Sequence, residues 1–280
     1  MKQLKDKVVA ITGAGSGIGK ATACLLASKG SHLALSDINE TGLQAVAEAC
    51  RIKGVQVSTS SLDVANREAV YAWADQVVRT HGQVHVIINN AGVALGATVE
   101  DMSYVDFEWL MNINFWGVVY GTKAFLPHIK TAGEGHIVNI SSIFGLIGVP
   151  TQSAYNAAKF AVKGFTESLR EELMIEGSAI GVSCVHPGGI KTNIAANARL
   201  TTSLGFTASN SRLEMEKMFM TRSEDAAHEI VEAIRRNRRR VLIGADAHAI
   251  DWLSRLMPAR YQDLLIMGGR WRRRSLLNKN

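Results

Sequence analysis

Short apolar runs alternate along the chain with longer segments in which apolar residues recur every three or four positions. The short runs are rich in β-branched residues and are predicted to be strands, at residues 7–12, 32–36, 55–61, 84–88, 135–140, 180–185 and 241–243. The helical spacing covers residues 18–29, 40–52, 66–81, 104–130, 154–176 and 224–236. Nearly continuous apolar strands need cover on both faces, and strands separated by helices pair in parallel. The pattern therefore predicts an α/β fold, a doubly wound parallel seven-stranded sheet with helices on both faces.

The domain organisation follows from the absence of any repeat, proline-rich linker or low-complexity stretch in this pattern. Residues 1–245 are predicted to form one domain, and residues 246–280 a basic C-terminal extension of it. The extension has apolar pieces at 252–257 and 264–267, separated by Pro258. Four interpretations stay open: helices packed on their own subunit, a lid over a ligand, an oligomer contact, or a peripheral membrane anchor.

Composition limits the class of protein. The 280 residues are 47% hydrophobic and 20% charged, which is typical of a packed globular chain and excludes collagen-like and disordered ones. Cys24, Cys50 and Cys184 are too few and too widely spaced for a disulfide framework, so a reducing compartment and a cytoplasmic location are expected. The four-residue apolar run before Thr12 is shorter than a secretory signal needs, and no run is long enough for a membrane span.

The net charge of +6 is concentrated near the end of the chain. Residues 221–280 hold 13 Lys+Arg and 7 Asp+Glu, whereas the two signs balance over residues 1–220. Arginines gather at 235–240 and 270–274, and such clusters can bind nucleic acid or anionic lipid. The first cluster closes a helical pattern, where cations suit the helix dipole. The second contains Trp271, so peripheral membrane contact stays open, whereas the neutral remainder argues against nucleic acid.

A glycine-rich turn, TGAGSGIG at residues 12–19, joins the first predicted strand to the first predicted helix. Glycines allow positive φ and a close approach of backbone N–H groups to a pyrophosphate at the helix N-terminus. This is the position of the phosphate site in a Rossmann βαβ unit. The turn therefore predicts a dinucleotide site with the residues Gly13, Ser16, Gly17, Ile18 and Gly19.

The carboxylate of Asp37 ends the second strand, 18 residues after Gly19. It could accept both ribose hydroxyls of NAD and would repel the extra phosphate of NADP. The alternative role is an N-cap for the next helix. Position 38 is Ile and position 16 is Ser, so neither supplies a basic side chain to pair with the extra phosphate of NADP. Lys20 is the nearby cation. NAD is the expected cofactor, and NADP is not excluded.

Two more groups follow predicted strands at the edge where open α/β sheets bind ligands. Asp63 could bond an adenine amine, and with Val64 it is assigned to the cofactor site. Asn90, Ala91 and Gly92 belong to the segment NNAG, whose small residues would let backbone lie against a ribose. Ordinary turn chemistry is the alternative for both groups.

Tyr155 and Lys159 are four residues apart on a predicted helix, and therefore share one face. A phenol has a pKa near 10, and an adjacent ammonium together with a cationic nicotinamide would favour the phenolate. Ser142 lies 13 residues before Tyr155, after a predicted strand, where its hydroxyl could hold a carbonyl oxygen. Alone, such a pair is an ordinary exposed helix face; beside a dinucleotide site, a catalytic role is favoured.

The chain resembles the short-chain dehydrogenase/reductase family over residues 5–245. The motifs TGAGSGIG (12–19), NNAG (89–92), MNINFWG around Asn114, NISS ending at Ser142, YNAAK (155–159) and HPGGIKT (186–192) occur in the family's order and spacing. The resemblance implies a single-domain Rossmann fold and an NAD(P)-dependent oxidoreductase. It also implies a homotetramer or homodimer built on the helices at 104–130 and 154–176, with Trp109, Phe115, Trp116, Phe165 and Leu169 supplying apolar area.

The family's roles carry over to matching residues. Tyr155 would be the general acid/base. Lys159 would bind the nicotinamide ribose and lower the pKa of the phenol, and Ser142 would orient the reacting oxygen. Asn114 would hold a water of a proton relay. Asn90 would contact the cofactor ribose, and the residues that flank the nicotinamide would be Pro187, Gly188, Ile190 and Thr192. Residues 190–222 would include the variable substrate loop.

Other chemistries find no motif in the sequence. HExxH, His/Cys clusters, GxSxG and GxxxxGK[ST] are all missing, so no catalytic metal is expected and a hydrolase or P-loop enzyme is disfavoured. The expected substrate wall is apolar: Val93, Leu95, Phe144, Leu146, Ile194, Leu200, Leu204, Phe206, Met215, Met218 and Met220. It predicts a hydrophobic secondary alcohol and its ketone. The alternatives are a non-catalytic dinucleotide-binding sensor or scaffold, and a reductase of lipid-like or acyl substrates at a membrane surface.

Overall fold

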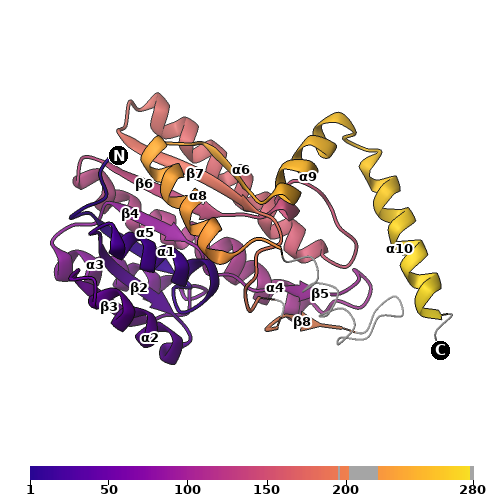
Figure 1. The fold of residues 1–280 in the computed structure, drawn as a ribbon, viewed down its shortest axis with the longest axis horizontal. Coiled ribbons are helices and arrows are strands. Elements are labelled where there is room, and N and C mark those ends of the chain that lie inside the picture. The colour runs from indigo at the N-terminus through magenta and orange to yellow at the C-terminus, as the bar shows by residue number, and fades with distance from the viewer. Residues whose placement is uncertain (195, 202–219, 278–280) are drawn as a thin grey trace.

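The computed structural model describes residues 1–194, 196–201 and 220–277, with only the backbone described for 272–277. Within them, seven parallel strands form one sheet in the order β3-β2-β1-β4-β6-β7-β9 (Figure 1). Their bounds are β1 (Val8–Thr12), β2 (His32–Asp37), β3 (Val57–Ser61), β4 (Val86–Asn89), β6 (Gly135–Ile140), β7 (Ile180–Pro187) and β9 (Arg240–Ile243). The order reverses between β1 and β4, which pair directly, and this reversal creates the crevice of a doubly wound sheet.

Helices cover both faces of the sheet. One face carries α1 (Gly17–Ser28), α2 (Glu40–Arg51) and α8 (Ser223–Arg236); the other carries α3 (Arg67–His81), α5 (Gly117–Thr131) and α6 (Ser153–Ile175). Alternate residues of β1 serve the two cores, with Val9 and Ile11 in the first and Val8 and Ala10 in the second. The central strands are buried and mostly apolar because their side chains face a core in both directions.

The expected helix over 104–130 is interrupted. The structure has α4 (Tyr104–Met111), a π-helical turn η1 (Asn112–Trp116) and then α5. A π turn admits one extra residue and leaves the spacing of apolar side chains nearly helical, so the sequence pattern does not reveal it. Three short elements were also missed: β5 (Leu95–Gly96) and β8 (Arg199–Leu200), which pair in parallel, and the 3₁₀ turn η2 (Ile143–Gly145).

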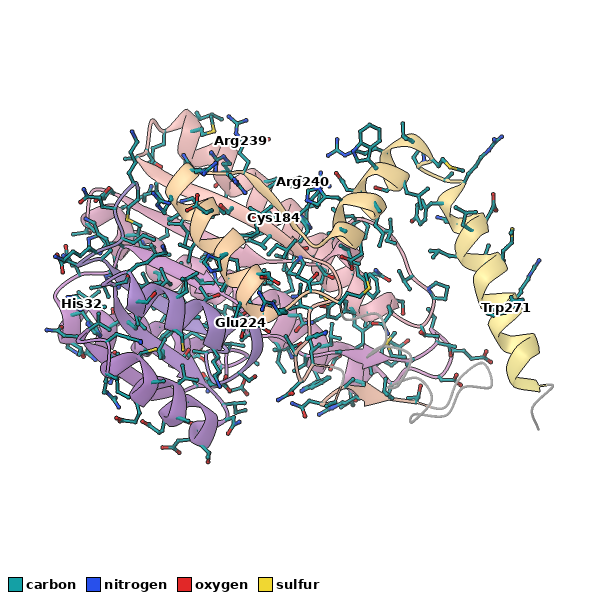
Figure 2. The ribbon with its side chains drawn as sticks, viewed as in Figure 1. His32, Cys184, Glu224, Arg239, Arg240 and Trp271 are labelled. Carbon is teal, nitrogen blue, oxygen red and sulfur yellow. The ribbon has the colours of Figure 1, made fainter. Side chains whose placement is uncertain are left out.

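The C-terminal extension forms two helices on either side of Pro258, α9 (Ala245–Leu256) and α10 (Tyr261–Leu277). The first packs on its own subunit, since Ala247 and Asp251 are buried and α9 contacts β9. The second leaves the layers of the sheet (Figure 1), and Figure 2 shows Trp271 on it, 72% exposed. No helix in the described part of the chain has the length and apolar character to cross a membrane.

Candidate active site

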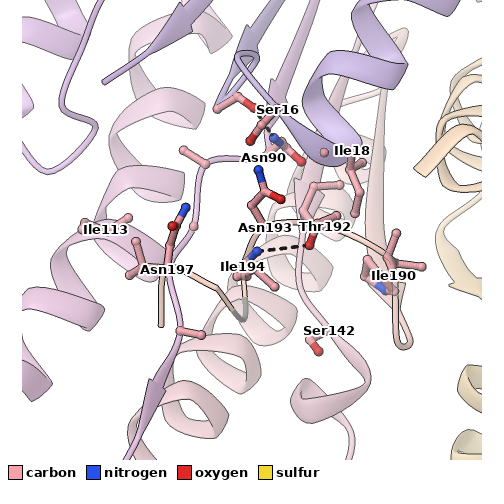
Figure 3. Close-up of a pocket in the computed structure, with 18 of the residues that line it drawn as sticks. Ser16, Ile18, Asn90, Ile113, Ser142, Ile190, Thr192, Asn193, Ile194 and Asn197 are labelled. Carbon is pink, nitrogen blue, oxygen red and sulfur yellow. Dashed lines mark hydrogen bonds between the residues drawn. The ribbon is translucent and has the colours of Figure 1, made fainter. Parts of the chain in front are cut away.

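A cavity of about 400 Å³ lies at the carboxyl ends of the central strands, where the strand order reverses (Figure 3). The expected site residues that line it are Gly13, Ser16, Gly17, Ile18, Asp37, Asp63, Val64, Asn90, Ala91, Gly92, Ser142, Tyr155, Lys159, Pro187, Gly188, Ile190 and Thr192. Gly19 and Asn114 lie behind its wall. Residues spread over more than 170 positions of sequence thus meet around one space.

The glycine turn fits closely against the segment after β4. Gly13 has a φ of +65°, and a Cβ there would lie 2.8 Å from the Cα of Ala91. A Cβ on Gly19 would lie 2.1 Å from the carbonyl oxygen of Gly13. Both positions therefore require glycine. Because α1 begins at Gly17 and the Ser16 side chain makes no capping bond, the first N–H groups of the helix are free to hold a phosphate.

The carboxylate of Asp37 fixes the far side of this turn. Its Oδ2 accepts the N–H of Gly15 at 2.8 Å, and its Oδ1 accepts the N–H of Asn39 at 2.8 Å. The N-cap of α2 is Asn39, whose Oδ1 accepts the N–H of Gly42. Asp37 is therefore not the cap of α2, and it places a negative charge in the cavity wall.

Asn90 ties the segment after β4 to the glycine turn. Its Nδ2 donates to the carbonyl oxygens of Thr12 and Gly13, each at 3.0 Å. The Thr12 hydroxyl accepts the N–H groups of Asn90 and Ala91. After β3, Asp63 Oδ1 accepts the N–H of Ala65 at 2.9 Å, as a turn residue does. Asn90 thus orders the backbone of the cavity floor, and Asp63 combines a turn with a place in the lining.

The loop after β7 forms the opposite wall, and its backbone is bonded to the end of β9 and to residues 220–221. The N–H of Gly188 donates to Ile243 O at 2.9 Å, and Gly189 O accepts the N–H groups of Met220 and Thr221. The N–H of Lys191 donates back to Thr221 O at 2.9 Å. The two ends of the predicted variable loop therefore lie side by side.

Tyr155 enters the cavity from the first turn of α6. The Ser142 hydroxyl interacts with the Tyr155 phenol and lowers its pKa, and Ser142 Oγ accepts the N–H of Phe144 at 3.1 Å. The Phe144 ring meets the Tyr155 ring edge-on at 6.1 Å. The Ser142 hydroxyl, predicted to hold a carbonyl oxygen, therefore lies with the predicted acid/base Tyr155 beside an aromatic wall.

The Lys159 ammonium lies 5.6 Å from the centre of the Tyr155 ring and donates to Ile140 O at 3.0 Å. Burial raises the pKa of Tyr155 to about 12, although the Ser142 hydroxyl lowers it, and burial lowers the pKa of Lys159 to about 8. The expected lowering of the phenol pKa by Lys159 is not the dominant effect, because removal of both groups from water outweighs it.

Asn114 lies in the π turn and is fully buried. Its Oδ1 accepts the N–H of Val93 and its Nδ2 donates to Val93 O, each at 2.8 Å. A Cβ on Gly92 would lie 3.2 Å from Asn114 Oδ1 and 3.7 Å from Lys159 Nζ. The side chain therefore holds the wall at Gly92 and Val93 in place from behind, close to Lys159.

Sequence reasoning missed four residues around this centre. Asn156, next to Tyr155, donates to Phe144 O and Ile147 O and accepts from Val149 N–H. Buried His186, with its pKa lowered by burial to about 4, has Nδ1 3.0 Å from Ser142 O. Gln152 and Asp246 line the cavity. Asn156 and His186 stand inside the motifs YNAAK and HPGGIKT, which was the available signal; the other two stand in no motif.

The expected substrate wall is only partly correct. Val93, Phe144 and Ile194 line the cavity. Leu95 is buried in a separate core cluster, Leu146 and Leu200 are not in the lining, and Met220 is 71% exposed. Leu204, Phe206, Met215 and Met218 lie outside the described residues. Within the part of the chain that is described, no three His, Cys, Asp or Glu side chains are grouped to hold a metal ion.

The sequence profile of the short chain dehydrogenase family matches residues 7–203. The chain belongs to this family of oxidoreductases, which confirms the expected family, and the structure confirms the doubly wound sheet.

Three known proteins illustrate the relationship. SadH of Mycobacterium tuberculosis, which is named as an oxidoreductase, is 48% identical over 96% of this chain and 97% of its own length. Estradiol 17-beta-dehydrogenase 11 of Homo sapiens is 34% identical over 94% of this chain and 83% of its own. The crystal structure of a short chain dehydrogenase/reductase from Burkholderia phymatum in complex with NAD is 31% identical. It has a TM-score of 0.84 and covers 95% of this chain and 97% of its own.

Proposed function

We propose that this oxidoreductase uses a nicotinamide dinucleotide to interconvert a hydrophobic secondary alcohol and its ketone, with Tyr155 as general acid and base. The observation that carries the proposal is a group of three side chains, buried Ser142, buried Lys159 and half-buried Tyr155, in the wall of a cavity whose other end is the glycine turn. A proton-transferring hydroxyl beside a dinucleotide cradle supports carbonyl chemistry rather than a purely sensory role.

The described residues fit such a cofactor. The uncapped start of α1 suits the pyrophosphate, and Gly13 and Gly19 leave room where a Cβ would meet backbone. The structure from Burkholderia phymatum holds NAD. The carboxylate of Asp37 favours NAD over NADP, because it would repel a phosphate on the ribose. The bound cofactor supplies or accepts the hydride.

The chain's own residues would handle the proton. In alcohol oxidation the Tyr155 phenolate would take the proton of the substrate hydroxyl as the hydride leaves the carbon that bears this hydroxyl. In ketone reduction the phenol would return the proton to the carbonyl oxygen. The Ser142 hydroxyl, beside the phenol, would turn its single proton to the reacting oxygen, which then receives hydrogen bonds from Tyr155 and from Ser142. The Lys159 ammonium, held by Ile140 O, would stabilise the phenolate and offset the burial that raises its pKa.

The substrate class rests on the cavity wall. Val93, Phe144 and Ile194 are apolar, and Gln152 and Asn197 add neutral polar groups. Apolar walls with few polar groups favour hydrophobic ligands. The name of the human relative indicates a hydrophobic secondary alcohol as its substrate. We therefore place bulky cyclic or long-chain ketones ahead of sugars and acyl carriers.

The test is a nicotinamide-absorbance assay of the purified protein with hydrophobic ketones and alcohols, against sugars of similar size as the control set. Turnover of the hydrophobic set alone supports the proposal. Dinucleotide binding without turnover of any carbonyl would overturn it in favour of a sensor.

A further inference from the structure

The first half of the C-terminal extension touches the cavity walls at two separate points. Asp246, in the first turn of α9, lines the cavity, and its Oδ2 accepts the N–H of Gly189 at 2.7 Å. Tyr261, the first residue of α10, is 8% exposed, and its hydroxyl accepts the N–H of Gly148 at 3.1 Å. One contact is on the loop after β7, and the other is on the segment between Ser142 and Tyr155.

The contact of Asp246 with the loop after β7 is close. A Cβ on Gly188 would lie 2.2 Å from both carboxylate oxygens of Asp246, and its three nearest atoms would all belong to that side chain. Gly188 is not among the glycines with positive φ, so its backbone conformation would tolerate a side chain. Glycine is therefore needed there to admit the carboxylate.

The contact of Tyr261 completes a set of bonds on the other wall. Asn156 already holds Phe144 O, Ile147 O and Val149 N–H. Tyr261 takes the N–H of Gly148, between two of those positions. The segment that links the two proposed catalytic hydroxyls is thus held from α6 and from the extension together.

The helix between the two contacts, α9, is held to the sheet by an ion-paired carboxylate. Asp251, in the middle of α9, is 8% exposed and pairs with Arg240 of β9 and with Arg255, the latter at 3.1 Å. A buried carboxylate bonded to two guanidinium groups is held firmly. The helix that carries Asp246 is therefore fastened to the sheet, and the contact of Tyr261 follows directly after it.

We propose that residues 245–261 act as a brace across the active site, with Asp246 and Tyr261 as positioning residues that hold the nicotinamide-side loop at Gly188–Gly189 and the Ser142–Tyr155 segment in register. The effect of the brace on the reaction rests on the proposed function, whereas the bracing of the two walls rests on the contacts alone. It gives part of the extension a role in the reaction.

The first test compares Asp246→Ala with Asp246→Asn. Asparagine keeps an acceptor for Gly189 N–H, so it should retain most of the wild-type kcat/KM. Alanine should lose about tenfold, the size of one buried hydrogen bond, mainly through weaker dinucleotide binding. Asp263→Asn, on exposed α10, is the control. Equal kcat/KM and dinucleotide Kd in the alanine variant and the wild type would overturn the brace.

The second test is a double-mutant cycle. Gly188→Ala should be damaging in the wild type and in Asp246→Asn, where the side chain at 246 keeps its size. In the Asp246→Ala background it should add little, because the atoms it would meet are gone. Fully additive losses of dinucleotide affinity would contradict the contact.

The third test needs no turnover, so it separates the brace from the proposed function. Hydrogen exchange of the Gly189 and Gly148 amides should accelerate in Asp246→Ala and in Tyr261→Phe respectively, while Tyr104→Phe, 88% exposed, leaves both unchanged. Accelerated exchange in a protein without carbonyl turnover would refute the proposed function and keep the brace. Unchanged exchange in both variants of an active enzyme would refute the brace alone.

Discussion

The Asp37 carboxylate accepts the main-chain N–H of Gly15 at 2.8 Å, so one side chain both shapes the glycine turn and sets the charge beside it. These two roles respond differently to substitution. Asparagine keeps one of the two oxygens that accept the N–H groups of Gly15 and Asn39 and removes the negative charge, whereas alanine removes both oxygens and the charge.

This relationship gives a prediction about cofactor choice. The wild type should have a higher kcat/KM with NAD than with NADP, and Asp37→Asn should narrow the ratio by about tenfold or more while keeping activity with NAD. Steady-state kinetics with both cofactors measures this ratio, and Glu40→Gln, at an exposed position in the first turn of α2, serves as the control. A wild-type preference for NADP, or an unchanged ratio in Asp37→Asn, would show that this residue does not set the choice.

The acid/base role of Tyr155 is tested by removing one oxygen. Tyr155→Phe should bind the dinucleotide almost normally and lose about two or more orders of magnitude in turnover, because only the proton donor is deleted. Lys159→Ala should reduce turnover and cofactor affinity together. Titration calorimetry and steady-state rates separate the two effects. Near-normal turnover in the phenylalanine variant would rule out this mechanism.

The buried ammonium of Lys159 should make stability depend on pH. Burial lowers its pKa from 10.5 to about 8, so between these values the unfolded chain binds more protons than the folded chain. The stability contributed by this group then rises with pH across that window, and the cost of burying the charge is complete below about pH 8.

Replacement of Lys159 by methionine should therefore raise Tm at neutral pH, and this gain should shrink toward pH 10. The loss of the hydrogen bond to Ile140 O reduces the gain at every pH. Lys163→Met, on the same helix but paired with Glu167 at the surface, is the control. Melting curves over this pH range check the prediction. A gain in Tm that did not change with pH would mean that the ammonium is not the source.

Self-association is the fourth prediction, with a homotetramer or homodimer expected. Leu169 is 7% exposed and belongs to the core, so it is not available as the sequence suggested. Trp116, on η1, is 43% exposed and Phe160, on α6, is 45% exposed, and η1 packs on α6. Light scattering should find an oligomer at micromolar concentration. Trp116→Asp with Phe160→Asp should dissociate it, and Ile52→Asp, at the 82% exposed C-cap of α2, should not. A wild-type monomer would refute the prediction.

The sheet was predictable because strands buried on both faces are mostly apolar, as β1 and β4 are. The cavity lining was largely predictable because motif residues such as Gly13 and Asn90 stand at strand ends. The π turn at Asn114 escaped because it changes the backbone and not the apolar spacing. Asp246 and Tyr261 escaped because their partners are 57 and 113 residues away, and no local pattern signals such a contact.

The direction of the pKa shifts of Tyr155 and Lys159 could not be predicted for a related reason. Spacing placed the two side chains on one face of a helix. How deeply that face is buried depends on Phe144 and the rest of the cavity wall, which only the folded chain assembles.

The pairing of Gly189 and Lys191 with Thr221 has an engineering consequence. Since the two ends lie side by side, the segment between Lys191 and Met220 can be treated as a cassette whose length can change without pulling on either junction, provided that an exchange keeps the pairing of β8 with β5. None of the bonds that hold the Ser142–Tyr155 segment comes from the described part of that cassette. Grafting the corresponding segment from a relative should therefore change substrate preference while Ser142 and Tyr155 keep the positions that proton transfer needs.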